Sequence, residues 1–285
     1  MKRLLLVILL LPLMVEGQKN RNDLNREPVT YSGPNAFHSI VLGKGLLADL
    51  YHTAMDPHVI FEVDPNQYDR IIKEVNNGVL TISADDDIKP RSNWKIRIYF
   101  NQLKSIKVVD GAKIYLQSNI KSEEAVGLSA DYQGKIFYKD DALIQAPDVN
   151  ITLDHRSSIE VHLATDRLQV NASDVSDLTT QFSRSLDRFW VSLDHDSTLD
   201  VKGNTAHSED LILEVSDHCD IDIRQIIADK VNLNIYGNSK IDVATAEEGT
   251  IEMVAKGNSR VNIWGTPIYK KVVLTQGSEL INQDR

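Results

Sequence analysis

Aspartate–histidine pairs recur at one position of a repeating pattern in the second half of this 285-residue chain. Asp154-His155 and Asp194-His195 stand before a small residue, and Asp174 takes the equivalent place between them. Carboxylate and imidazole groups are ligands of divalent metal ions, so His155, Asp174 and His195 are weak candidates for a metal site. The two histidines would lie about 9–10 Å apart across two layers of strands, which favours a solvated ladder of polar turns and no metal. A Ser-His-Asp triad is disfavoured, because no nucleophile-elbow pattern surrounds the serines.

Charged residues also recur on the far side of the same small residues. One column holds carboxylates and a second column supplies cations; the members are Asp200, Asp222 and Asp242, with Lys240 and Arg260 beside them. Stacked carboxylates repel one another unless a cation offsets them, and Ca²⁺ accepts several oxygen ligands. A Ca²⁺ ion on this face is therefore one interpretation. A charged, solvated face without a cofactor is the favoured one.

The same face is where a polysaccharide lyase would hold its calcium and its Lys or Arg base. A glycan-active enzyme is therefore the alternative function, although we predict no catalytic residue. Trp190 and Trp264 fall at or beside outward positions, where an exposed ring can stack on a sugar, but a single tryptophan more often packs at the edge of the core. These two rings and the five charged residues are the candidate ligand-binding residues. The chain has no glycine-rich phosphate loop, metalloprotease helix or dinucleotide fingerprint.

A repeat of about 20 residues positions these side chains. The segments VNLNIYGNSKIDV and IEMVAKGNSRVNI superimpose on their Gly-Asn-Ser corners. In each repeat, apolar residues stand six and four places before a small corner residue and two and four places after it. The corner residues are Ala112, Gly134, Ser157, Ser176, Ser197, Cys219, Ser239, Ser259 and Ser278.

Alternation with period 2 inside a fixed longer period is typical of stacked β-coils. We therefore predict an all-β fold: a right-handed parallel β-helix, or solenoid, of about nine coils with its apolar residues inside. Leucine-rich repeats share the length, but they need a helical return, and the return segments here are short and polar. Cys219 is the single cysteine, which excludes an intramolecular disulfide and a cysteine-based metal site, and we expect it to replace a structural serine.

Residues 104–285 are predicted to form the solenoid repeats, and residues 31–103 an N-terminal β region of the same domain. Alternating runs and turn residues indicate strands throughout residues 31–103. Asn76-Asn77-Gly78 predicts a hairpin turn. The segment from Tyr68 to Val75 fits either a helical turn or a strand.

The N-terminus has the pattern of a secretory signal peptide over residues 1–17. A basic start precedes an apolar core that is too short for a comfortable membrane span, and Gly17 follows it; a buried helix is the less favoured interpretation. Residues 18–30 are polar and are expected to be a flexible leader. No later segment is long and apolar enough to span a membrane. No cysteine follows the signal, so we do not expect a lipoprotein anchor.

Charge limits the partners. The chain carries a net charge of −10, and removal of residues 1–17, which carry +1, would leave −11. An acidic exported protein is a poor candidate for nucleic-acid binding. We expect a location in the periplasm, at the cell surface or outside the cell.

Short motifs in a fixed order support a family resemblance that covers most of the chain. They are Phe37-x-x-Ile40, Val59-x-Phe-Glu-Val63, Val75-Asn-Asn-Gly-Val-Leu-Thr-Ile82, Ile96-x-Ile-Tyr99, Leu103-x-x-Ile106-x-Val108 and the repeated Gly-x-Ser corners. With these motifs the chain resembles the auto-transporter adhesin head, GIN-type domain family of exported Bacteroidetes proteins. Where that family usually has a proline before the Leu-x-x-Ile step, Asn101-Gln102 stands here, and the corners at Ser176, Ser197 and Cys219 also depart from the pattern.

The resemblance implies a β-solenoid and a surface or periplasmic location, and it transfers no catalytic residue. We therefore expect an exported, non-enzymatic, adhesin-like or structural binding module of the bacterial envelope, which recognises glycan or protein through a solenoid face. Self-assembly into a homo-oligomer is a further hypothesis. It rests on the last coil, near Ser278, which has little sequence after it to cap its open strand edges.

Overall fold

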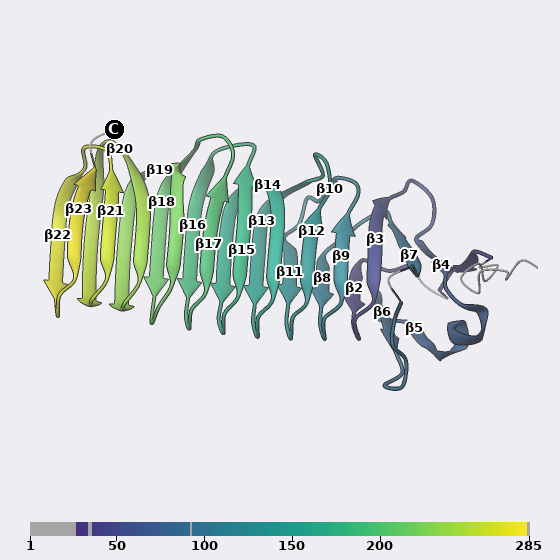
Figure 1. The fold of residues 1–285 in the computed structure, drawn as a ribbon. Helices are drawn as coiled ribbons and strands as arrows, with labels where there is room; N and C mark the ends of the chain where they lie inside the picture. The colour runs from purple at the N-terminus through teal and green to yellow at the C-terminus, as the bar shows by residue number, and fades with distance from the viewer. Residues whose placement is uncertain (1–26, 34–35, 92, 284–285) are drawn as a thin grey trace, which may run out of the picture.

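The computed structural model describes residues 27–33, 36–91 and 93–283. The predicted signal peptide (1–17) and most of the predicted leader (18–30) lie outside these residues. Within them the protein is an elongated β-solenoid with a single 3₁₀ helix, η1 (Pro65–Arg70) (Figure 1). No helix in this described part is long and apolar enough to cross a membrane.

The 23 strands of this described part form one hydrogen-bonded sheet that is wound into coils. Each coil has one strand that leads into a corner and one that leaves it, and we call the two resulting walls the entry sheet and the exit sheet. From the N-terminal end, the entry sheet contains β5 (Ile71–Asn76), β6 (Val79–Ala84), β2 (Ser39–Leu42), β8 (Ser105–Val108), β11 (Val126–Ala130), the second parts of β13 (Leu143–Leu153) and β14 (Ser158–Ala172), β16 (Leu186–Leu193), β18 (Ala206–Val215), the second parts of β19 (Asp220–Gly237) and β20 (Lys240–Gly257), and β22 (Ile268–Thr275).

The exit sheet is built in the same way on the other side of the corners. Its strands are β4 (His58–Glu62), β7 (Lys95–Phe100), β3 (Leu47–His52), β9 (Lys113–Leu116), β12 (Lys135–Tyr138), the first part of β14, β15 (Asp177–Phe182), β17 (Thr198–Lys202), the first parts of β19 and β20, β21 (Arg260–Trp264) and β23 (Glu279–Gln283). Alternate residues of both sheets point inward and form one continuous apolar core. The predicted all-β solenoid of about nine coils is confirmed.

The return segments form a third, short wall that the sequence did not predict. The strand β10 (Ile120–Lys121) pairs with β13, and the pairing continues with Ile144 beside Leu163 and with Ala206 beside Ile226. Ala244 and Thr245, which the sequence placed in a polar return, are buried. Each coil therefore closes around the core on three sides.

The corners are tight because consecutive residues adopt left-handed backbone conformations. His155 and Arg156 have φ angles of 49° and 60°. Later corners use glycine, and at Gly257 (φ 102°) a Cβ would lie 2.1 Å from the carbonyl oxygen of Gly237 in the preceding coil. Only glycine fits there, because both the backbone conformation and the contact between coils exclude a side chain.

Small residues inside the corners make a ladder of hydrogen bonds, as the repeat predicted. Ser239 is buried; its hydroxyl donates to the Asp217 carbonyl (2.6 Å) and accepts from the amide of Cys219 in the preceding coil (3.2 Å). Cys219 occupies the same place in its own coil, with Sγ 3.1 Å from the Ser216 carbonyl. Burial raises the pKa of this thiol to about 12, so Cys219 is an unreactive substitute for serine.

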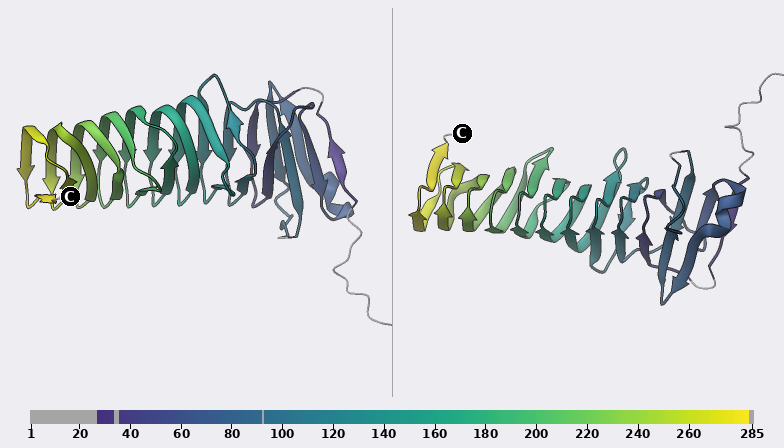
Figure 2. Two further views of the ribbon diagram at one scale, coloured as in Figure 1. Left: turned by 90° about the horizontal axis from the view of Figure 1, so that it is seen from above. Right: turned by 60° about the horizontal axis from the view of Figure 1, so that its bottom comes forward.

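The N-terminal end closes with antiparallel strands and an unexpected order of coils. The coil β2–β3 lies between the coil β6–β7 and the coil β8–β9, although it precedes both in the sequence. β1 (Val29–Tyr31) and β4 cover the end of the exit sheet, and β5 covers the end of the entry sheet, all in antiparallel pairing (Figure 2). The hairpin at Asn77-Gly78 is confirmed, and the ambiguous segment 68–75 contains the end of η1 followed by β5.

The serine ladder leads to a stability prediction. Ser239→Ala removes a buried hydroxyl and leaves the Cys219 amide without its acceptor, which is expected to cost about 1–3 kcal/mol. Cys219→Ser keeps a corner hydrogen bond and should change the free energy of unfolding by less than about 1 kcal/mol. Urea unfolding of both variants measures the difference, and equal losses for the two would contradict a hydrogen-bonding role for the corner.

Candidate functional site

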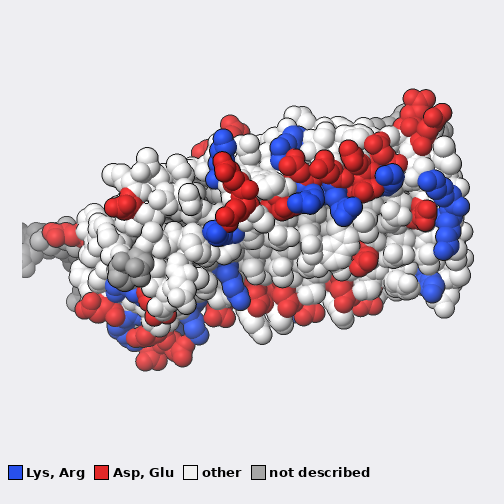
Figure 3. Space-filling model, turned by 180° about the vertical axis from the view of Figure 1, so that it is seen from behind, with Lys and Arg blue, Asp and Glu red and all other residues white. Residues whose placement is uncertain are grey.

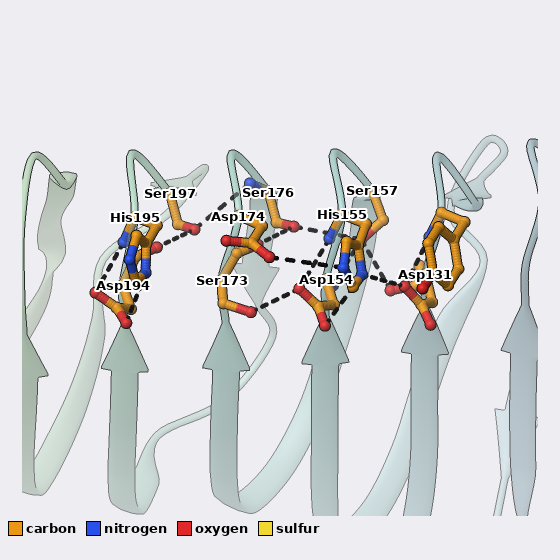
Figure 4. A network of polar contacts seen from close by, with 12 residues as sticks. Asp131, Asp154, His155, Ser157, Ser173, Asp174, Ser176, Asp194, His195 and Ser197 are labelled. Atoms are coloured by element: carbon orange, nitrogen blue, oxygen red, sulfur yellow. Dashed lines mark hydrogen bonds and ion pairs between the residues drawn. The ribbon is translucent and has the colours of Figure 1, made fainter.

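Aspartate, histidine and serine side chains form a continuous polar ladder along the corners (Figure 4). The Asp154 carboxylate accepts hydrogen bonds from the amide of His155 (2.9 Å) and from the Ser173 hydroxyl of the next coil (2.8 Å). Asp194 repeats this arrangement two coils later, with the amide of His195 (2.9 Å) and a hydroxyl from its neighbouring coil. These carboxylates cap their own turns and also join one coil to the next.

His155 lies among three carboxylates. Its Nδ1 atom is 2.9 Å from Asp131 and 3.2 Å from Asp154, and its Nε2 atom is 3.7 Å from Asp174. The hydrogen bond to Asp131 raises the pKa of His155, because it stabilises the charged imidazolium. The ring also stacks on Tyr132 with a centroid separation of 4.3 Å. His155 therefore acts as a counter-ion for the acidic corner.

The structure does not bring His155, Asp174 and His195 together as one metal site. Nε2 of His195 faces Asp217, at 3.5 Å, on the side away from Asp174. Two other groups have mutually close ligand atoms: Asp131, Asp154 and His155, and Asp194, His195 and Asp217. Each group could offer one imidazole nitrogen and two carboxylate oxygens, but the contacts within them are those of capped turns with a histidine counter-ion.

The outer edge of the corners is hollowed at two places. The first groove has a volume of about 490 Å³ and lies over four consecutive corners; its lining residues are Tyr132, Gln133, His155, Arg156, Asp174, Val175, His195 and Asp196. The second, of about 310 Å³, lies over the last corners and is lined by Asn238, Ser239, Lys240, Asn258, Ser259, Arg260, Gly277 and Glu279. Both grooves are open, and Lys240 and Arg260 of the predicted site line the second one.

The predicted acidic column exists on the outer face of the exit sheet. Asp200, Asp222 and Asp242 are direct neighbours in register, and Asn262 continues the row. Their charges are already offset by cations from the same face. Arg224 donates hydrogen bonds to Asp222, which lowers the pKa of that carboxyl, and Lys202 lies 3.5 Å from Asp200.

Asp242 is buried and has two partners. Lys240 lies 3.3 Å from one of its oxygens, and the Asn262 amide donates to the other at 2.6 Å. The hydrogen bond to Asp242 raises the pKa of Lys240, so the ammonium group holds its proton at neutral pH and is unsuited to act as a base. Arg260 pairs with Glu279 at 3.2 Å. This face forms a self-neutralised network, and a calcium ion would have to displace these cations.

The two candidate tryptophans lie on different walls. The Arg224 guanidinium lies over the ring of Trp264, 5.0 Å from its centroid, so that ring face already has a partner. Trp190 belongs to β16, in the entry sheet, and its half-buried side chain points outward. Trp264 and the acidic column therefore share the exit sheet, and Trp190 belongs to a separate surface.

The surface around Trp190 carries few charges, a feature that was not predicted from the sequence. Two outward positions of β13, β14, β16, β18 and β19 align in register across five coils. The ten residues are Asn150, Thr152, Gln169, Asn171, Trp190, Ser192, Ile212, Glu214, Asn232 and Asn234. Only Glu214 is charged, and we call this set the amide face. Figure 3 shows it as a broad white area below a band of mixed charge.

The amide face has free hydrogen-bonding groups and a defined border. Among the described residues, no side-chain hydrogen bond engages the five amides; these are Asn150, Gln169, Asn171, Asn232 and Asn234. The bordering row of charges pairs within itself: Arg167 with Asp148 (2.7 Å), and Arg188 and Lys230 with Asp210 (3.7 and 3.5 Å). A ligand on this face would meet unpaired donors and acceptors at regular intervals.

His155 leads to a prediction for the pH dependence of stability. Its pKa is raised in the folded state, so the stabilisation is fully present below the unfolded value of about 6.5 and is lost as pH rises through the folded value. The melting temperature of the native protein should therefore fall relative to that of His155→Gln across this window. Melting curves at several pH values measure this, and parallel profiles would contradict a counter-ion role for His155.

Comparison with known proteins agrees with this architecture. No curated protein matches the chain. A putative adhesin from Parabacteroides merdae has a TM-score of 0.65 at 13% identity, covering 91% of this chain and 97% of its own. A putative adhesin from Parabacteroides distasonis has a TM-score of 0.64 at 11% identity, covering 91% and 98%. A putative lipid binding protein from the same species has a TM-score of 0.52 at 13% identity, covering 90% and 96%.

These likenesses show a shared fold at low sequence identity. The family model described as "Putative auto-transporter adhesin, head GIN domain" matches residues 36–267, which is most of the chain and includes all but the last coil. This confirms the resemblance derived from the short motifs. The chain belongs to the auto-transporter adhesin head GIN domain family.

Proposed function

We propose that this protein is an exported, adhesin-like binding module that recognises a neutral, repetitive polymer, a glycan, with its amide face. One observation carries the proposal. Of the ten aligned outward residues in five coils, only one is charged, whereas 25% of the residues in the whole chain are charged.

The chemistry of the amide face suits hydroxyl-rich ligands. Asparagine and glutamine side chains both donate and accept hydrogen bonds, as sugar hydroxyls do. Neighbouring coils repeat these groups about every 4.8 Å, so that a chain molecule lying along the solenoid axis would meet several of them. Many weak contacts then add up through multivalency.

Trp190 lies in the middle coil of the amide face and offers an aromatic ring to a sugar. Its neighbours in the same row are Gln169 and Ile212, which leave the ring edge without a charged partner. The acidic protein as a whole repels anionic polymers at long range. An uncharged face on such a protein therefore favours a neutral glycan over an acidic one.

The glycan-active alternative lacks a comparable observation. Its candidate base, Lys240, is paired with Asp242, and Asp222 is held by Arg224. These side chains stabilise one another across the exit sheet, which gives them a structural role. We therefore propose binding without bond cleavage.

Substitution of Trp190 tests the proposal. In glycan binding assays with neutral polysaccharides, Trp190→Ala should weaken binding about tenfold, equivalent to about 1.4 kcal/mol. Asn171→Asp should also weaken it, because a carboxylate on the amide face cannot donate a hydrogen bond.

Tyr132→Ala is the matched control, because Tyr132 is an exposed aromatic residue in the corner groove. It should bind like the native protein. Loss of binding in Tyr132→Ala with full binding in Trp190→Ala would move the site to the corners and contradict the proposal.

A further inference from the structure

The last coil of the described residues is an open layer. β22 and β23 form this coil, and among the described residues no strand covers the far edge of either. All eight residues of β22 are exposed, and five are large and apolar: Ile268, Tyr269, Val272, Val273 and Leu274. The N-terminal end differs, because antiparallel strands close it.

The inward-facing side chains of β22 are apolar, and a further coil stacked on this end would bury them. Val272 and Leu274 pair in register with Met253 and Ala255 of the preceding coil, which are fully buried. In β22 the equivalent side chains are 37% exposed. Apolar surface at an open strand edge favours the addition of another strand, since the edge also offers unpaired backbone donors and acceptors.

We propose that two copies of this chain dock end to end through this coil, around a two-fold axis that passes through Val273 and Ile281. An axis perpendicular to both sheets places β22 antiparallel to β22 of the second copy, and β23 antiparallel to its own counterpart. The inference does not depend on the proposed glycan binding.

The pattern of β22 is self-complementary around Val273. Val273 of one copy then lies opposite Val273 of the other copy. On the core side, Val272 of each copy pairs with Leu274 of the other. Lys271 lies opposite Thr275, and the two Lys271 residues lie about 13 Å apart along the strands. No like charges lie opposite each other, and the apolar side chains of the two strands pack together around the axis.

The pattern of β23 fits the same axis. Around Ile281, Leu280 pairs with Asn282 of the second copy and Glu279 with Gln283, again without opposed like charges. The register with β21 places Leu280 and Asn282 on the core side. Ile281 therefore stands between two inward positions of β23, as Val273 does between Val272 and Leu274 in β22.

The positions of the two axis residues relative to the corner explain why one axis can serve both strands. Val273 stands five residues before Ser278 and two residues before the end of β22, and Ile281 stands three residues after Ser278 and two residues after the start of β23. In every coil these places lie between the two inward positions on either side of the corner. The two residues are therefore level with each other on opposite walls.

The position of Lys271 favours this register of the β22 pair over the neighbouring registers. A shift of two residues toward the start of β22 would place Lys271 opposite itself, and like charges directly across a strand pair are destabilising. A two-fold axis perpendicular to the sheets also keeps both entry sheets on one side of the dimer. The two amide faces would then lie on the same side of one longer rod.

Sedimentation of the purified protein tests the docking. The native protein should show a concentration-dependent dimer, and Val273→Lys should be monomeric because it brings two ammonium groups together on the axis. Val175→Lys is the matched control, since Val175 is an exposed valine on the corner edge, and it should dimerise like the native protein. A native protein that stays monomeric at high concentration, or a Val273→Lys dimer, would overturn the proposal.

Cysteine cross-linking tests the axis itself. A residue on the axis meets its own copy at a Cα separation of about 4.5–5.5 Å, which a disulfide can span. Val273→Cys and Ile281→Cys, made separately, should each give a covalent dimer under mild oxidation, whereas the exposed Met55→Cys at the other end should not. The native Cys219 is buried and does not interfere. Equal cross-linking of Val273→Cys and Met55→Cys would contradict the axis.

Discussion

Parallel hydrogen bonding between each coil and the next is the constraint on which the other features of this protein depend. From β8 to β18 the entry sheet keeps its register without a bulge. A residue type that recurs at one place in the repeat therefore becomes a straight row on the surface. The corners keep this register, because left-handed residues turn the chain sharply and buried hydroxyls tie each turn to its neighbour.

The corners, the exit sheet and the amide face differ in chemistry, although the same repeated coil forms all three. Along the corners, histidines lie among carboxylates, and His155 and His195 each contact aspartates of neighbouring coils. On the exit sheet, Arg224 and Lys240 neutralise the aspartates around them. The amide face keeps its polar groups free. A partner gains more from unpaired amides than from ion pairs, because existing pairs must first be broken and desolvated.

The repeat itself was predictable from local signals. Period-2 alternation around small residues located the nine corners, and it correctly aligned Asp200, Asp222 and Asp242 in one column. The coil order at the N-terminal end was not predictable, because the placement of β2–β3 between later coils is decided by long-range pairing. Arg224 was missed because the candidate cations stand one place after the corner residue, whereas Arg224 stands five places after Cys219, as Lys202 does after Ser197. A metal-binding column of His155, Asp174 and His195 was the less favoured interpretation, and the His195 ring turns toward Asp217; such a rotamer choice depends on packing.

The amide face was missed for a different reason. Its signal is a lack of charge at two outward positions, and that pattern appears only when the rows before the corner are compared across five coils. The charged residues after the corner, which were the predicted site, lie on the exit sheet and form a stabilising network there.

Hydroxyl-radical footprinting with a bound neutral polysaccharide tests the central claim most directly. Trp190 reports on the amide face, and Tyr132 and Trp264 report on the corners and the exit sheet in the same sample. The account predicts that the ligand protects Trp190 and leaves the other two unchanged. Protection of Tyr132 or Trp264 with an unchanged Trp190 would contradict it.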